Sequence, residues 1–129
     1  MDVLSSRFLL RASDFDASIR FYRDRLGLPV YREWRGGVVF FLGGGYLEVS
    51  GSAAPEAATG TATGTGLWLQ VRDLARTRDD LARRGVHASE PQRMPWGLLE
   101  MEARDPDGVR LVFVEVPADH GLRRGDPAS

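Results

Sequence analysis

The sequence predicts an α+β fold made of two similar modules, each with the order strand, helix, three strands. An aspartate that can cap a helix follows a short apolar strand in each half of the chain, at Asp14 and again at Asp73. Glycine-rich breaks divide the rest of the first half into short strand-like runs, and an Asp-Pro-Asp-Gly turn divides the end of the second. The two halves therefore form a weak but ordered internal repeat.

The first half begins with a short strand at Phe8-Leu9-Leu10, after which Ser13 or Asp14 can cap a helix. Apolar residues then recur at helical spacing and give one buried stripe, which ends at Gly27. The stripe consists of Phe15, Ile19, Tyr22 and Leu26. Three strands should follow, at 28–33, 38–42 and 46–50.

The second half repeats this order, with a strand at 67–71, a helix from Asp73 to Gly85 and a strand near 86–89. A hairpin comes last, because Pro106 pre-sets φ for the turn and Gly108 accepts a positive φ without strain. Its antiparallel strands are expected at 98–104 and 109–115.

Composition predicts one domain over residues 1–129, because this length with 43% hydrophobic residues can bury a real core. Module one should cover about 7–50 and module two about 65–116. Between them lies a linker, 51–64, rich in Ala, Thr, Gly and Ser, and a loose tail follows at 117–129. Each module's helix covers one sheet face, so the other faces should line a cleft around which the mixed sheet curls.

Charge and cysteine content exclude several function classes. A formal net charge of -1 gives no general attraction to nucleic acid or to an anionic membrane. The chain has no cysteine, which excludes disulfides, thiolate metal sites and a cysteine nucleophile. No run approaches the roughly 20 apolar residues of a membrane span, and the first residues lack an apolar signal segment. A cytoplasmic protein is therefore expected.

The hairpin and the segment from Asp14 to Leu28 together resemble the vicinal-oxygen-chelate superfamily, which holds glyoxalase I, bleomycin-resistance proteins and extradiol dioxygenases. Trp96 and Gly97 match a Pro-Trp-Gly run of bleomycin-resistance-like members, which is followed there by Arg-Glu-Phe. In that second run Glu100 matches the Glu, whereas Leu99 departs from the Arg. The resemblance covers almost the whole chain and implies a homodimer, with exchange of modules between chains as an open alternative.

The resemblance also implies where a metal would bind, because metal-dependent members carry a His or Glu on each of four cleft-facing strands. The matching positions are Arg7, Glu48, Gly66 and Val112. Only Glu48 can ligate, since a guanidinium offers no acceptor and Gly and Val have no donor side chain. His87 and His120 lie away from these strands, which favours solvated surface positions over ligands. We therefore expect no metal and no other cofactor.

Strand alternation indicates which side chains share the cleft face with these positions. Trp68 is the strongest candidate for a ligand-binding residue, since its indole would fill the volume that metal and substrate occupy in metal-dependent members. For any single Trp, packing in the core or at a dimer contact remains the alternative. The predicted ligand-binding residues are Arg7, Arg11, Trp34, Phe41, Tyr46, Glu48, Trp68, Gln70, Trp96 and Glu100.

These observations favour a metal-independent protein that encloses a small, partly aromatic organic molecule; the resemblance implies sequestration of an antibiotic or toxin. The alternative is an enzyme of the same fold, either a metal-dependent lyase or isomerase or a metal-free enzyme with Glu48 as base. Glu48 is the only catalytic candidate. It shares its face with Arg7 and Arg11, so we predict an ion pair instead. A purely structural or interaction module stays open as a third reading.

Overall fold

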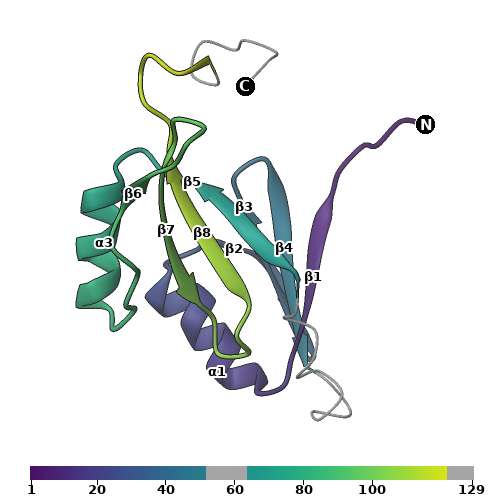
Figure 1. Ribbon diagram of the computed structural model, residues 1–129. Coiled ribbons are helices and arrows are strands. Elements are labelled where there is room, and N and C mark those ends of the chain that lie inside the picture. The colour runs from purple at the N-terminus through teal and green to yellow at the C-terminus, as the bar shows by residue number, and fades with distance from the viewer. Residues whose placement is uncertain (52–63, 122–129) are drawn as a thin grey trace. The chain divides into compact units, whose positions relative to one another are not determined.

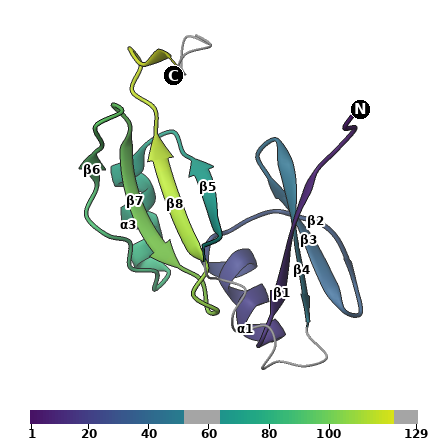
Figure 2. The same cartoon turned by 45° about the vertical axis from the view of Figure 1, so that its right-hand side comes forward.

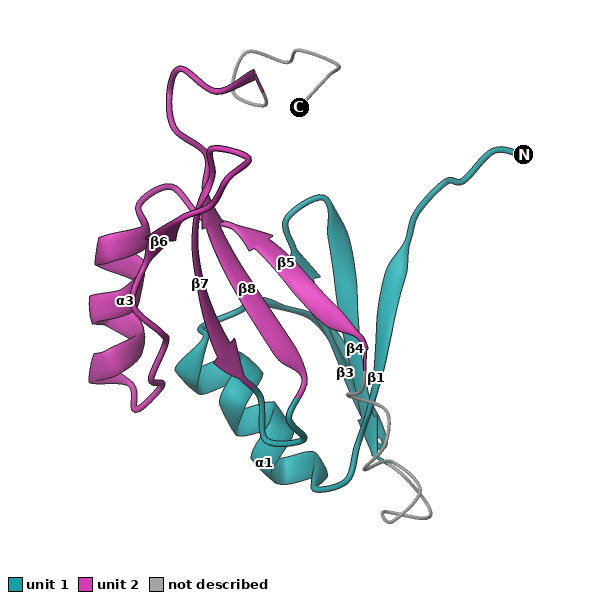
Figure 3. Cartoon of the chain, in the orientation of Figure 1, with its two compact units in different colours: residues 1–63, 105–108 teal, residues 64–104, 109–129 magenta. Residues whose placement is uncertain are grey.

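The structure of the protein is a computed structural model that describes residues 1–51 and 64–121. It contains two compact units (Figure 3). Unit 1 comprises residues 1–63 and 105–108, and unit 2 comprises residues 64–104 and 109–129. Each unit holds one four-stranded sheet with parallel and antiparallel pairs, so the predicted α+β class is confirmed. Most of the expected linker and of the expected tail lies outside the described residues.

In unit 1 the strand order is β1-β4-β3-β2, with β1 parallel to β4 and the other neighbours antiparallel (Figure 1). Helix α1 continues directly into a wider helical segment, η1, and α1 packs against β4. The elements are β1 (Arg7–Ala12), α1 (Phe15–Ile19), η1 (Arg20–Arg25), β2 (Val30–Trp34), β3 (Gly37–Leu42) and β4 (Gly45–Gly51).

The first helix begins where the sequence predicts, because the Asp14 carboxylate accepts a hydrogen bond from the Ala17 backbone N–H at 3.1 Å. Its second half differs from a regular α-helix: the Leu26 N–H donates to the Phe21 carbonyl, five residues earlier, at 2.8 Å. The wider turns bring Phe21 into the core beside Tyr22, with their rings edge to face at 5.1 Å. The predicted stripe therefore gains a member that regular helical spacing does not include.

The turn Asp105–Gly108 belongs to unit 1 and has the predicted geometry. Gly108 has φ +83°, and its N–H donates to the Asp105 carbonyl at 2.9 Å. The buried Tyr22 hydroxyl donates to Asp105 Oδ2 at 2.7 Å, and the Ser13 N–H donates to Asp107 Oδ2 at 3.1 Å. Both aspartates therefore fix the turn to the segment around the first helix.

In unit 2 the strand order is β5-β8-β7-β6, with β5 parallel to β8. Helix α3 packs against β7 and β8, as Figure 2 shows. The Asp73 carboxylate caps this helix by accepting from the Arg76 N–H at 3.0 Å, the same role that Asp14 has in unit 1. The elements are β5 (Gly66–Gln70), α3 (Leu74–Arg83), β6 (Gln92–Arg93), β7 (Leu99–Arg104) and β8 (Arg110–Glu115).

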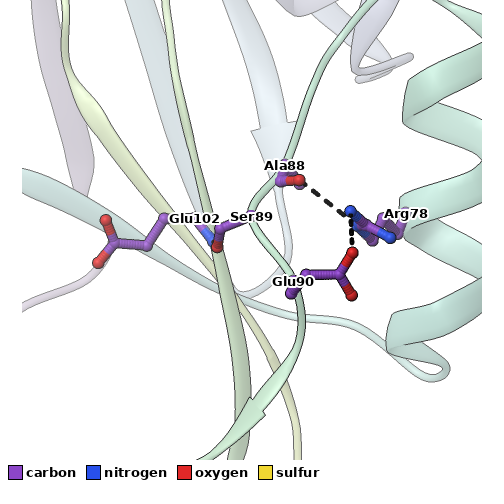
Figure 4. Close-up of polar contacts among 5 residues, drawn as sticks. All are labelled: Arg78, Ala88, Ser89, Glu90 and Glu102. Carbon is purple, nitrogen blue, oxygen red and sulfur yellow. Dashed lines mark hydrogen bonds and ion pairs between the residues drawn. The ribbon is translucent and has the colours of Figure 1, made fainter.

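The strand expected near 86–89 is wrong, because the edge strand β6 lies at Gln92–Arg93 instead. Residues 88–90 are held mainly by side chains (Figure 4). Arg78 of α3 donates to the Ala88 carbonyl at 3.4 Å and to Glu90 Oε1 at 3.0 Å. Ser89 exchanges hydrogen bonds with the Glu102 backbone, through its N–H at 2.8 Å and its Oγ at 2.9 Å. A local sequence pattern does not predict hydrogen bonds of this kind.

The strand register bears out the internal repeat. Leu9 of β1 lies opposite Glu48 of β4, and Trp68 of β5 lies opposite Val112 of β8. Leu9 and Trp68 are 59 residues apart along the chain, the same offset as between the helix caps Asp14 and Asp73, whereas Glu48 and Val112 are 64 residues apart. Among residues 1–51 and 64–121, no helix is long and apolar enough to cross a membrane.

Candidate functional site

The sheet of unit 1 has a packed face and an open face. Phe40, Leu47 and Val49 are fully buried on the packed face, where the Phe40 ring lies 6.3 Å from that of Tyr22. Since paired residues of neighbouring strands share a face, the register assigns alternate residues to the open face. This open face of unit 1 has three rows, in which Val39 and Gly37 are themselves buried: Phe41, Tyr46 and Arg7; Arg32, Val39, Glu48 and Leu9; Trp34, Gly37, Ser50 and Arg11.

Two aromatic rings of the first row, Phe41 and Tyr46, form a cluster with Tyr31 of β2. Tyr31 stacks on Tyr46 with ring centroids 4.9 Å apart and lies 5.0 Å from Phe41. Tyr31 reaches this face because the register of β2 shifts between Val30 and Arg32. Both Tyr31 and Phe41 remain substantially exposed, at 48% and 43%. The cluster therefore presents a broad aromatic surface.

The predicted ion pair of Glu48 is confirmed. Arg7 Nη1 donates to Glu48 Oε1 at 2.8 Å, across the parallel strands β1 and β4. The pair is partly exposed, so its contribution to stability is small, on the order of 0–1 kcal/mol. The pair does, however, engage one carboxylate oxygen of Glu48 in a charge-assisted hydrogen bond.

The sheet of unit 2 has a similar open face, on which Trp68 lies opposite Val112 and is 52% exposed. Beside them Arg110 Nε donates to Glu102 Oε1 at 2.7 Å. This hydrogen bond and the charge of Arg110 hold the pKa of the Glu102 carboxyl below its ordinary value. The open face of unit 2, in which Val112 and Val114 are buried in a small apolar cluster, consists of Gly66, Trp68, Gln70, Gln92, Glu100, Glu102, Arg104, Arg110, Val112 and Val114.

Trp96 reaches this second face from the turn between β6 and β7. Its indole Nε1 donates to Glu100 Oε2 at 2.7 Å, while 55% of the residue stays exposed. Gly97, with φ +92°, completes the turn. The Trp96 carbonyl lies 3.0 Å from His120 Nε2, so the C-terminal segment holds the turn that carries the indole. His120 is therefore a partly exposed histidine with a fixed partner, a contact that the sequence does not predict.

The four positions that the resemblance gives to metal ligands do not supply a donor set. Arg7 and Glu48 in unit 1 hold the same register positions as Gly66 and Val112 in unit 2. Glu48 alone has a donor oxygen, and that carboxylate is paired with Arg7. In the part of the chain that the structure describes, no three His, Cys, Asp or Glu side chains gather as they would around an ion. The residues present do not fit a divalent cation.

The sequence-predicted site residues divide between the two units, and their part in binding stays a prediction. Unit 1 carries Arg7, Arg11, Trp34, Phe41, Tyr46 and Glu48 on its open face. Unit 2 carries Trp68, Gln70 and Glu100 on its open face, with Trp96 bonded to Glu100. The sequence pattern does not reveal Tyr31, because strict alternation fails at a shifted register, nor His120, whose hydrogen bond joins distant parts of the sequence.

Comparison with known proteins identifies the family. The model of the Glyoxalase/Bleomycin resistance protein/Dioxygenase superfamily matches residues 5–113. The glyoxalase / bleomycin resistance protein from Catenulispora acidiphila DSM 44928 is 28% identical, with a TM-score of 0.69 over 89% of this chain and 100% of that one. No curated protein matches the sequence.

Two further solved structures share the fold at lower identity. The bleomycin resistance determinant encoded on transposon Tn5 is 22% identical, with a TM-score of 0.71 over 88% of this chain and 98% of that one. A bleomycin-binding protein in complex with bleomycin is also 22% identical, with a TM-score of 0.67 over 91% and 100%. At this identity the likeness concerns the fold alone.

Proposed function

Because this chain belongs to the Glyoxalase/Bleomycin resistance protein/Dioxygenase superfamily, we propose that it is a metal-independent binding protein for a small, partly aromatic organic molecule. The observation that carries the proposal is a set of aromatic side chains on the open sheet faces, each between 43% and 52% exposed. Exposed aromatic surface next to charged groups is typical of a surface that binds a partner. The set comprises Tyr31, Trp34, Phe41 and Trp68.

Polar side chains beside these rings would orient the ligand. Arg7, Arg11 and Glu48 provide them in unit 1, and Gln70 and Glu100 in unit 2. One solved structure with this fold holds bleomycin, which supports sequestration of an antibiotic or toxin as the biological role. We further propose that the protein works in the cytoplasm as a homodimer, the form that the family resemblance implies.

The rival proposal, an enzyme with Glu48 as general base, finds less support. A base needs a carboxylate oxygen free to take a substrate proton at hydrogen-bond distance. In Glu48, Oε1 already accepts from Arg7 at 2.8 Å, so the guanidinium engages one of the two carboxylate oxygens. A metal-dependent lyase or isomerase would need a donor set that Arg7, Gly66 and Val112 do not supply.

The proposal is tested by elemental analysis and by ligand titration of the purified protein. We expect no stoichiometric transition metal. We also expect that bleomycin, or another member of a panel of planar aromatic and glycopeptide compounds, changes Trp emission and raises the melting temperature. A ligand at 100 times its Kd should add about 2.7 kcal/mol to the free energy of unfolding. Trp68→Ala should weaken this binding, whereas Arg20→Gln, on the exposed side of η1, should not.

Two results would contradict the proposal. About one metal ion per chain, lost on Glu48→Ala, would show that the metal positions function despite their composition. A catalytic rate that Glu48→Gln abolishes, without a comparable loss of ligand affinity, would decide for the enzyme.

A further inference from the structure

The third row of the open face of unit 1 combines an indole, a hydroxyl and a guanidinium. Trp34, Gly37, Ser50 and Arg11 lie opposite one another on the successive strands β2, β3, β4 and β1. Neighbouring strands are about 4.8 Å apart, and Gly37, which lies under the indole, is two strands away from Arg11. About 10 Å therefore separates the backbone of Gly37 from that of Arg11. This is the scale of a small substituted aromatic ligand.

The indole of Trp34 lies flat on the sheet because Gly37 has no side chain. A Cβ built on Gly37 would stand 2.5 Å from Cζ2 of the indole, 2.8 Å from Cε2 and 3.0 Å from Cη2. The Cβ position is nearly equidistant from these three consecutive ring atoms. If it lay in the plane of the ring, Cε2 and Cη2 would be much farther from it than Cζ2. Gly37 therefore touches a ring face. Trp34 remains 45% exposed, which leaves the other side of the ring for stacking.

The charges of this face favour an anionic ligand. Its four charged side chains are Arg7, Arg11, Arg32 and Glu48. The only carboxylate, Glu48, is paired with Arg7, so their charges offset each other. Within residues 1–51 and 64–121, neither Arg11 nor Arg32 has a hydrogen-bond or ion-pair partner. Arg11 lies opposite Ser50, and Arg32 is two residues before Trp34 on the same side of β2. One uncompensated guanidinium group, that of Arg11, thus lies in the row that carries the indole, and a second, that of Arg32, lies in the neighbouring row.

We propose that this row is a subsite for a planar aromatic group that carries an anionic substituent such as a carboxylate. The inference rests on the proposed function and names the chemical class of its ligand. The aromatic ring stacks on the outer face of the Trp34 indole. The anion accepts hydrogen bonds from the Arg11 guanidinium and from the Ser50 hydroxyl.

A cationic aromatic ligand is the natural competitor, because a cation is also attracted to an indole face. On this sheet face, however, the cation would meet Arg11 and Arg32, and the one carboxylate already binds Arg7. The positive charge of the ligand and those of the two guanidinium groups would repel each other on this partly exposed face. The open face of unit 1 therefore selects against the cation.

The test compares three probes that share one ring system: 2-naphthoate, neutral 2-naphthamide and cationic 2-naphthylmethylammonium. Titration calorimetry should give the lowest Kd for naphthoate, at least tenfold below that of the cation, with a difference that shrinks at high salt. Arg11→Gln should raise the Kd of naphthoate about tenfold and leave that of naphthamide unchanged. Arg20→Gln removes an exposed arginine outside this face and should leave all three unchanged.

Gly37→Ala provides a second, independent variant that keeps every ligand-contacting side chain. The added methyl group would overlap the Trp34 ring, so the indole must move off the sheet. Both Gly37→Ala and Trp34→Ala should weaken naphthoate and naphthamide alike, because both disturb stacking. Melting curves of each variant show that it is folded, and near-UV circular dichroism of Gly37→Ala reports the displaced indole.

Failure of the subsite and failure of the proposed function give different results. If another panel compound binds and Trp68→Ala weakens it, while naphthoate does not bind, the proposed function stands and the subsite is wrong. The subsite is also wrong if the cation binds as tightly as naphthoate, or if Arg11→Gln leaves charge selectivity unchanged. If neither the panel nor the three probes bind, both are wrong.

Discussion

Replacing Tyr22 with phenylalanine should remove a specific loss of stability at alkaline pH. The Tyr22 side chain is fully buried, and its hydroxyl donates to Asp105 Oδ2 at 2.7 Å. Burial, and then the neighbouring Asp105 carboxylate, raise the pKa of Tyr22 far above its ordinary value of about 10. The folded protein therefore keeps a proton that the unfolded chain loses. This contribution to stability is fully present below pH 10 and declines as the pH rises above it.

The magnitude follows from the release of one proton on unfolding. Above the unfolded-state pKa, the free energy of unfolding should fall by about 1.4 kcal/mol per pH unit, so about 1.4 kcal/mol is lost between pH 9 and pH 11. For a domain of this size that corresponds to a drop of about 4–8 °C in Tm. No lysine or cysteine titrates between pH 9 and pH 11, because the chain contains neither residue. Only its three tyrosines have an ordinary pKa near 10.

Urea denaturation at pH 9, 10 and 11 measures this effect directly. At neutral pH, Tyr22→Phe should be less stable than wild type by about 1.5–3 kcal/mol, because a hydrogen bond to a carboxylate is lost. Its stability should then fall less steeply with pH than that of wild type. Tyr31→Phe is the matched control, since Tyr31 is 48% exposed, and it should keep the wild-type slope. Equal slopes for wild type and Tyr22→Phe would refute the assignment of a protonated, buried phenol.

Three other variants test individual features of the fold. Asp73→Ala should lower the free energy of unfolding by about 1 kcal/mol in urea melts, because a helix loses its cap; an equal loss in Asp79→Ala, on the exposed side of the same helix, would contradict this reason. Gly108→Ala, at φ +83°, should cost about 1–2 kcal/mol, and a neutral result would show that the turn relaxes. In a variant with Trp96 as its only tryptophan, His120→Ala should shift the emission maximum, and an unchanged spectrum would mean that the bond to the Trp96 carbonyl does not hold the turn.

The parts of the fold that the sequence predicts correctly depend on local chemistry. Asp14 and Asp73 cap helices because an aspartate side chain reaches the N–H three residues on. Gly108 forms the hairpin turn because few other residues accept a positive φ. The placement of Arg7 and Glu48 on one face also follows, since alternation along a strand is strict where the register is regular.

The parts that the sequence does not predict depend on contacts between distant residues or on departures from regular geometry. The wide turns of η1, which bury Phe21, break the helical period on which the buried stripe was based. The register shift in β2 turns Tyr31 toward Tyr46 and Phe41. The hydrogen bond between His120 and the Trp96 turn joins residues 24 positions apart, and no local sequence pattern predicts it.

The internal repeat gives one more argument about the ligand, because equivalent positions of the two open faces differ in chemistry. The register aligns Arg7 with Gly66, Leu9 with Trp68, Arg11 with Gln70 and Glu48 with Val112. A cation, an aliphatic group and a carboxylate in unit 1 thus correspond to a glycine, an indole and a valine in unit 2. Two faces that differ in this way cannot bind the same chemical group equally well. The two faces should therefore have different ligand preferences. The naphthoate selectivity, which depends on the face of unit 1, should disappear with Arg11→Gln and survive Trp68→Ala.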